Sequence, residues 1–109
     1  MATILRNKVI NNVGEVPVDV IETSGAQRAT VIGMSLTNLT SSFVYVDILI
    51  QDDTSITGHY LKQTLLPANT SLRAVSTGEK LILAPSNKLQ VRSSVNDSVD
   101  VIVSYAEII

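Results

Sequence analysis

The chain has a single histidine, His59, which is the first residue to consider for catalysis or metal binding. It lies between Gly58 and Tyr60, close to an expected turn. An imidazole can act as a general base or bind a metal, but a metal site needs at least two good ligands. The sequence offers no cysteine and no second histidine. We therefore interpret His59 as an ordinary strand residue and predict no catalytic residue and no metal ligand there.

The densest group of carboxylates is Asp52-Asp53, with Asp47 nearby. A calcium-binding loop needs oxygen ligands at alternating positions, a glycine at the sharp bend and a final glutamate. The segment from Asp52 to Gly58 reads DDTSITG and lacks that spacing. Because aspartate often closes turns by accepting hydrogen bonds from nearby backbone amides, we predict a solvated turn. A cation held by these three aspartates is the alternative.

The remaining motifs favour structure over catalysis. Serine and threonine are abundant, but no Gly-x-Ser-x-Gly sequence is present, and the five glycines form no phosphate-binding loop. Three Asn-x-Ser/Thr triplets begin at Asn38, Asn69 and Asn96, and we interpret them as turn residues. Tyr45 and Tyr60 could stack on sugar rings, although packing is the simpler role. We predict no enzyme and no cofactor.

Composition limits the class of protein further. The chain has 109 residues, of which 45% are hydrophobic and 17% are charged, so one domain with a buried core is expected. The absence of cysteine excludes disulfides. A net charge of -2, with dispersed basic residues, argues against nucleic-acid binding. No apolar run is long enough to span a bilayer, and the first residues do not resemble a secretory signal.

The elements that position these residues are β-strands, because apolar and polar residues alternate along most of the chain. Val, Ile and Thr, which favour strands, make up about a third of it. Strands are expected over residues 16–20, 29–39, 43–51, 58–63, 71–76, 79–83, 88–92 and 99–105. Turn residues separate them every 8–12 residues or so, as in sandwiches and small barrels. We predict an all-β, antiparallel sandwich of eight or nine strands, jelly-roll-like or immunoglobulin-like.

Two segments contain a residue that interrupts regular pairing. Pro17 identifies the 16–20 segment as an edge strand or the start of one. In the 29–39 strand, alternation places Ile32 on the same face as Met34 and Leu36. Gly33 predicts a bulge or a close backbone approach within that strand.

The N-terminal residues 1–13 differ from the rest, because amides and basic residues separate isolated apolar pairs. They form either an outer strand of the sandwich or an arm that adds a strand to a neighbouring subunit. Residues 14–109 form the single sandwich domain. If residues 1–13 are an arm, removing them leaves a folded domain that no longer assembles. If they are an internal strand, the truncated chain unfolds.

Long stretches of the chain resemble a known group of proteins. The stretch ATVIGMSLTN at residues 29–38, the strand at 44–51 and the segments 81–94 and 98–108 carry the similarity. They resemble small β-rich virion structural proteins of tailed bacteriophages, which include capsid decoration (cement) proteins and tail, neck or fibre components. The resemblance implies a non-enzymatic protein, made in bacterial cytoplasm and built into the virion. Its partners would be the major capsid protein or other virion proteins.

From this resemblance we hypothesise a decoration protein that clamps capsid subunits as a homo-oligomer, with a trimer favoured. The alternatives are a tail, neck, baseplate or fibre-associated protein, or a carbohydrate-binding module for host glycans. Neither nucleic acid nor a membrane is expected as a partner. The predicted partner interface comprises Ile4, Leu5, Arg6, Lys8, Val9, Ile10, Phe43, Leu49, Ile102 and Ile108.

Overall fold

A computed structural model describes residues 2–76 and 78–108. They form nine strands, which confirms the predicted all-β class and strand number. The strands are β1 (Thr3–Val13), β2 (Val18–Glu22), β3 (Arg28–Asn38), β4 (Val44–Gln51), β5 (Thr57–Leu66), β6 (Ser71–Val75), β7 (Leu81–Leu83), β8 (Lys88–Ser93) and β9 (Val99–Ile108). No helix in these residues is long and apolar enough to cross a membrane.

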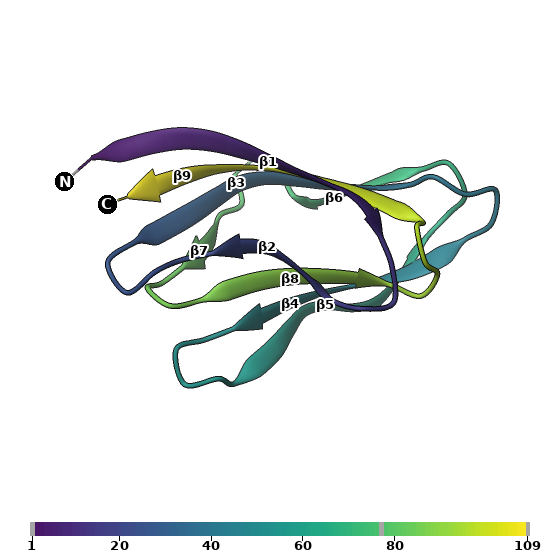
Figure 1. Cartoon of the computed structure of the whole chain (residues 1–109). Helices are drawn as coiled ribbons and strands as arrows, with labels where there is room; N and C mark the ends of the chain where they lie inside the picture. Colours follow the sequence, from purple (N-terminus) through teal and green to yellow (C-terminus); the bar gives the residue numbers. More distant parts are fainter. Residues whose placement is uncertain (1, 77, 109) are drawn as a thin grey trace.

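The strands form two antiparallel sheets packed face to face, as predicted for a sandwich (Figure 1). Sheet A has the order β1-β9-β3-β6, with β7 pairing the first part of β3. Sheet B has the order β2-β8-β4-β5. Among the described strands, β4 and β5 are the pair that is both consecutive in the chain and hydrogen-bonded. Nearly every other connection crosses from one sheet to the other.

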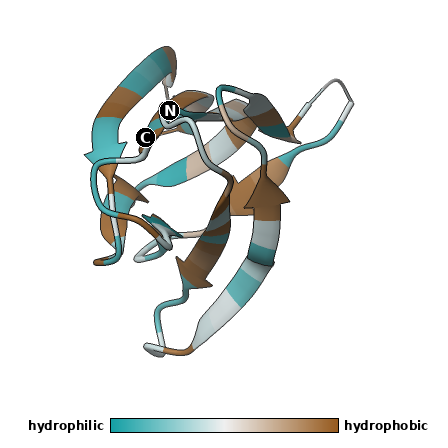
Figure 2. Cartoon of the chain, turned by 90° about the vertical axis from the view of Figure 1, so that its right-hand side faces the viewer, coloured by the Kyte–Doolittle hydropathy of each residue, from teal (hydrophilic) through white to brown (hydrophobic). Residues whose placement is uncertain are grey.

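The core lies between the sheets and consists mainly of small aliphatic side chains. Along β9, Val99, Val101 and Val103 are fully buried, and Tyr105 continues the same face. The residues between them point outward, so the predicted alternation of this strand is confirmed. Figure 2 shows bands of hydrophobic and hydrophilic residues along the strands. One continuous hydrophobic cluster holds the two sheets together.

A bulge in β3 corrects one detail of the sequence analysis. The pairing of β3 with β9 shifts between Val31 and Gly33, so the predicted interruption at Gly33 is confirmed. The extra residue is Ile32, which is exposed, whereas Val31 joins Met34 in the core. The prediction that Ile32 shares the face of Met34 is therefore wrong. A bulge inserts one residue and reverses the alternation on one side of it.

The first two strands, β1 and β2, each form the edge of a sheet. Residues 3–13 pair with β9 of the same chain and form one edge of sheet A. Pro17 directly precedes β2, which starts at Val18 and forms an edge of sheet B, as predicted. Proline cannot donate a backbone hydrogen bond, so it is tolerated before an edge strand.

Of the three asparagines interpreted as turn residues, Asn69 and Asn96 do lie in turns. Asn38 does not. It is the last residue of β3 and is buried between the sheets. A buried amide must find hydrogen-bond partners, and this one finds several, so it serves as a structural residue of the core.

Candidate functional site

The outer face of sheet A is the most distinctive surface of the molecule, because large hydrophobic side chains project from it into solvent. The antiparallel register places Val9 opposite Ile102, and Leu5 opposite Ala106. Thr30 lies between Ala106 and Ile82, which brings β7 into the same face. Five of its side chains are 47–75% exposed, and we call them the apolar face: Leu5, Val9, Ile32, Ile82 and Ile102.

The residues between these side chains are small and mostly uncharged. Asn7 pairs with Ser104 across β1 and β9. The charged residues of this face lie at its margins: Arg28 begins β3, Arg73 is on the edge strand β6, and Asp100 is near the start of β9. A surface patch that is apolar and uncharged at its centre, with a polar rim, is the usual composition of a protein-binding site.

The outer face of sheet B is different, because ionic and polar pairs cross it. Arg92 Nη1 lies 2.7 Å from Asp47 Oδ2, and Gln90 Nε2 donates to Asp19 at 2.7 Å. Lys88 Nζ lies 3.4 Å from Glu22 Oε2 at the end of the same strand pair. The two outer faces therefore differ in charge, although sheet B also exposes Tyr45 and Leu65, which lie opposite each other on β4 and β5.

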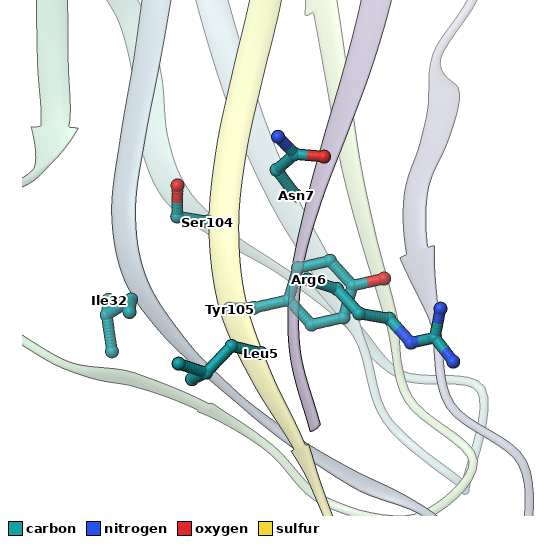
Figure 3. A pocket seen from close by; sticks show the side chains of 6 residues that line it. All are labelled: Leu5, Arg6, Asn7, Ile32, Ser104 and Tyr105. Atoms are coloured by element: carbon teal, nitrogen blue, oxygen red, sulfur yellow. The ribbon is translucent and has the colours of Figure 1, made fainter. Parts of the chain in front are cut away.

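Sheet A also carries two shallow hollows, on either side of the β3 bulge. The first, of about 550 Å³, is lined by Leu5, Ile32 and Ser104 among others. Figure 3 shows the Leu5 side chain lying across β9, with Ile32 beyond it, while Arg6 and Tyr105 extend the other way. The second hollow, of about 330 Å³, lies between Ile32, Ile102 and Arg73. The bulge therefore shapes this surface as well as exposing Ile32.

The predicted interface residues do not form one surface. Leu5, Val9 and Ile102 lie on the apolar face, and the half-buried Ile108 lies on the same side of β9. The other predicted residues of β1 alternate onto its opposite side: Ile4, Arg6, Lys8 and Ile10.

The last two predicted interface residues lie away from sheet A. Leu49 is on the outer face of sheet B, and the exposed Phe43 precedes β4. Sequence reasoning missed Ile32 and Ile82 as members of the apolar face. Ile32 required knowledge of the bulge, and Ile82 is exposed because β7 is a short edge strand beside β3.

The carboxylates considered for a cation have separate structural roles. Asp47 is buried, pairs with Arg92, and accepts a hydrogen bond from the backbone N–H of Gln63 at 2.6 Å. Asp53 is exposed on the β4–β5 turn. Within residues 2–76 and 78–108, no three His, Cys, Asp or Glu side chains gather where they could hold a metal. His59 is exposed on β5, opposite Leu49.

Asp52 closes the β4–β5 turn. Its Oδ1 accepts hydrogen bonds from the Thr54 hydroxyl at 2.6 Å, the Thr54 N–H at 2.9 Å and the Ile56 N–H at 3.0 Å. The Thr54 hydroxyl, followed by the Ile56 amide, holds the pKa of Asp52 below its ordinary value of 3.8. The predicted solvated turn, with aspartate accepting from backbone amides, is confirmed.

No protein-family model matches the chain, and no curated protein is similar to it in sequence. Solved structures, in contrast, resemble it over almost its full length. A chain of the acid-stable capsid of Helicobacter pylori bacteriophage KHP30 gives a TM-score of 0.58 at 9% identity. The match covers 99% of this chain and 89% of that one. The likeness is one of fold.

Two further structures resemble the chain. A mutant VP2 protein from infectious bursal disease virus particles gives a TM-score of 0.59 at 12% identity over 96% of this chain. The match spans only 31% of the VP2 chain, so this chain corresponds to about a third of its length. A protein of Bacillus endospore appendages, described as disulfide-linked pili, gives a TM-score of 0.56 at 7% identity, with 96% and 86% of the two chains covered.

Proposed function

We propose that this chain is a non-enzymatic structural component of a virus particle, and specifically a decoration (cement) protein that binds and stabilises a capsid shell. The observation that carries the proposal is the likeness, over 99% of this chain and 89% of its neighbour, to a chain of a bacteriophage capsid. The resemblance of the sequence to virion proteins of tailed phages supports the same role. The protein would then reside in the virion after assembly in the bacterial host cytoplasm.

The strand order supports the proposal. In sheets β1-β9-β3-β6 and β2-β8-β4-β5, most consecutive strands lie in different layers, the exceptions being β4 with β5 and β6 with β7. We infer that the sandwich is of the jelly-roll type, in which two Greek keys interleave in this manner. An immunoglobulin-like sandwich distributes its strands differently, in sheets ABED and CFG. Jelly rolls are common among capsid domains.

The apolar face supplies the docking surface in this proposal. Three strands of about 33 Å, with β6 and β7 sharing the fourth position and strands about 4.8 Å apart, give roughly 600 Å² in projection. A stable interface buries about 800 Å² on each partner, so the face, with its side-chain relief, is close to the required size. Shell symmetry repeats each contact many times, which converts a modest affinity per copy into strong retention on the particle.

The absence of cysteine distinguishes this proposed role from that of the Bacillus endospore appendage protein. A pilus protein of the disulfide-linked kind needs cysteines to join its subunits, and this chain has none. Association through an apolar face fits the sequence better. We propose a homo-oligomer, with a trimer favoured, in which the side carrying Ile102 and Ile108 contacts another copy or the shell. Light scattering at micromolar concentration tests the oligomer, and a strict monomer in solution and on the particle contradicts it.

Copy number in purified particles of the encoding virus tests the location. A shell protein is expected at on the order of hundreds of copies per particle, because shell symmetry repeats its site. A count of at most about a few dozen would instead assign it to the tail, neck, baseplate or a fibre. Absence from the particle would contradict the virion role altogether.

Binding to shells stripped of the protein tests the docking surface. We expect the double substitution Leu5→Ser and Ile102→Ser to weaken binding by about 100-fold, because two apolar side chains would no longer be buried. Ile56→Ser in the β4–β5 turn is the control, since Ile56 is 67% exposed and lies outside sheet A. Equal loss in both variants would contradict docking through the apolar face.

An exposed aromatic pair favours a second candidate function, binding of host-surface glycans. The rings of Phe43 and Tyr45 meet edge to face at 78°, with centroids 5.6 Å apart, and both side chains are exposed. Such rings can stack on the apolar faces of sugars. Tyr60 lies elsewhere on β5, because the partner of Tyr45 on that strand is Leu65. Binding of surface polysaccharide that is lost in Tyr45→Ala and retained in Tyr60→Ala would support this candidate.

A further inference from the structure

The two sheets have four edges, and three of them are interrupted. β2 has five residues, follows Pro17, and shifts register between Asp19 and Ile21. β5 shifts register twice against β4, and Gln63 within it has a φ of 46°. The far edge of sheet A is divided between β6, with five residues, and β7, with three. Short, bulged or proline-bearing edges resist pairing with further strands.

The remaining edge, β1, is regular over residues 3–10, before a register shift between Ile10 and Val13 where Asn12 has a φ of 55°. It has 11 residues, and its pairing with β9 continues without a shift from Thr3 to Ile10. Residues 5–9 are all exposed, so no element within residues 2–76 and 78–108 covers the strand there. An edge strand leaves a row of backbone N–H and C=O groups unpaired on its outer side. β1 is therefore a ready template for one more strand.

The side chains of β1 select which strand can bind. Arg6 and Lys8 lie on one side of the strand, and Leu5 and Val9 lie on the apolar face. Arg6 Nε is 3.4 Å from Glu107 Oε2 of β9. Among the described residues, no carboxylate lies within salt-bridge distance of Lys8. The edge therefore presents positive charge on one side and hydrophobic side chains on the other.

Charge disfavours a second copy of β1 in the register that aligns the centres of the two strands. Antiparallel pairing that joins Leu5 to Val9 of the copy would place Arg6 opposite the copy's Lys8, twice. Like charges directly opposite each other destabilise a strand pair, whereas opposite charges stabilise it. β9, which already pairs with β1, shows the favourable pattern. Its Glu107 is flanked by apolar residues and forms an ion pair with Arg6.

We propose that the free edge of β1 binds, by strand addition, an extended segment of another protein in which acidic residues alternate with apolar ones. The carboxylates lie beside Arg6 and Lys8, and the apolar side chains extend the face formed by Leu5 and Val9. Main-chain hydrogen bonds supply the affinity and the alternating side chains supply the specificity. The inference does not depend on the virion role, because the unpaired main chain of β1 carries it, although Leu5 and Val9 also belong to the apolar face.

Nuclear magnetic resonance of the full chain tests the inference. The probes are two short end-blocked peptides, one alternating Glu with Val and one alternating Lys with Val. We expect amide shifts confined to residues 3–10 and a Kd at least about ten-fold lower for the acidic peptide, since two favourable charge pairs replace two unfavourable ones. Lys8→Glu is expected to abolish that preference. Lys62→Glu, an exposed residue on β5, is the matched control and should retain it.

Four results would overturn the inference. They are equal affinities for the two peptides, shifts that map to Ile32 and Ile102 instead of β1, absence of binding at millimolar peptide, and a dimer of the free chain whose contacts run along β1. Shell binding is read separately, with an Ile82→Ser and Ile102→Ser variant that leaves β1 unchanged, so failure of one proposal is distinguishable from failure of the other.

Discussion

The buried side chain of Asn38 forms hydrogen bonds with several segments of the chain. Its Nδ2 donates to the carbonyls of Ser42, Leu66 and Pro67 at 2.9–3.1 Å. Its Oδ1 accepts from the backbone and hydroxyl of Thr40 at 2.9 and 2.8 Å. The end of β3, the start of β4 and the end of β5 thus meet at one amide. Its buried donor and acceptor are both satisfied, which is the condition for tolerating a polar group in a core.

Asn38→Asp should destabilise the fold strongly. The substitution replaces the donating amino group with an oxygen that faces three carbonyls, so buried acceptors lose their donor and a charge is buried without a partner. We expect a loss of about 3 kcal/mol or more in the free energy of unfolding. Urea denaturation measures it, with the exposed Asn11→Asp in β1 as the control. Equal stability of the two variants would contradict a stabilising role for the Asn38 hydrogen bonds.

Asp52 should make the β4–β5 turn sensitive to acid. Because the folded turn lowers its pKa below 3.8, the carboxylate stabilises the turn above that pH, and this contribution is lost as pH falls through the lowered folded pKa. The amide resonances of Thr54 and Ile56 should therefore titrate with a midpoint below 3.8. Asp52→Asn should remove this titration, and a midpoint at or above 3.8 in the wild type would contradict the assignment.

At the scale of elements, the corner between β1 and β2 depends on a close approach at Gly14. A Cβ at this position would collide with Asn96 Oδ1 and lie 3.0 Å from the Asn96 Cα. The same Asn96 oxygen accepts the Glu15 N–H at 2.9 Å, so the side chain cannot move away without losing that bond. The backbone of Gly14 also accepts the Ser93 N–H at 2.8 Å, which ties the corner to β8.

Gly14→Ala is accordingly expected to cost about 1–3 kcal/mol in stability, because the corner must shift to admit the methyl group. Gly58→Ala is the matched control, since a Cβ there meets nothing within 4 Å. Its effect should stay within about 0.5 kcal/mol. Thermal unfolding of both variants measures the difference. Equal melting temperatures would contradict the close approach.

The β3 bulge shows where sequence patterns stop being sufficient. Gly33 predicted an interruption, but alternation alone placed Ile32 on the face of Met34 and Leu36, and the structure places it on the opposite, exposed face. A glycine signals that a bulge is permitted, whereas the residue that is inserted depends on how β3 and β9 align over their whole length. Periodicity therefore placed Ile32, a member of the apolar face, on the wrong side of its strand.

At the scale of the whole molecule, β1 contributes little to the core yet much to the surface. Val13 is fully buried and its carbonyl accepts the Ser98 N–H at 3.1 Å, so Val13 belongs to the folded domain. Residues 5–9 are exposed on both sides of the strand. The predicted boundary at residues 13 and 14 thus passes directly beside a core residue.

Removal of residues 1–10 should leave a folded sandwich, because Val13 and the other strands of both sheets remain. The truncated chain is expected to lose the binding of the acidic peptide and to bind shells at least about ten-fold more weakly, since Leu5 and Val9 are lost. Circular dichroism and shell co-sedimentation measure these properties. A truncated chain that unfolds would identify β1 as indispensable to the core, and one that binds shells normally would contradict the role of Leu5 and Val9.

Alternation, β-branched composition and turn residues were enough to predict an all-β sandwich with eight or nine strands, because those signals are local. Strand ends were also close to prediction at Pro17 and along β9. Local signals did not predict the order of strands in each sheet or the outward position of Ile32. They also did not predict that Leu5, Ile82 and Ile102 lie together on one face. These features depend on pairing between segments far apart in the chain, and a side chain's alternation specifies which face it takes but not which strand lies beside it.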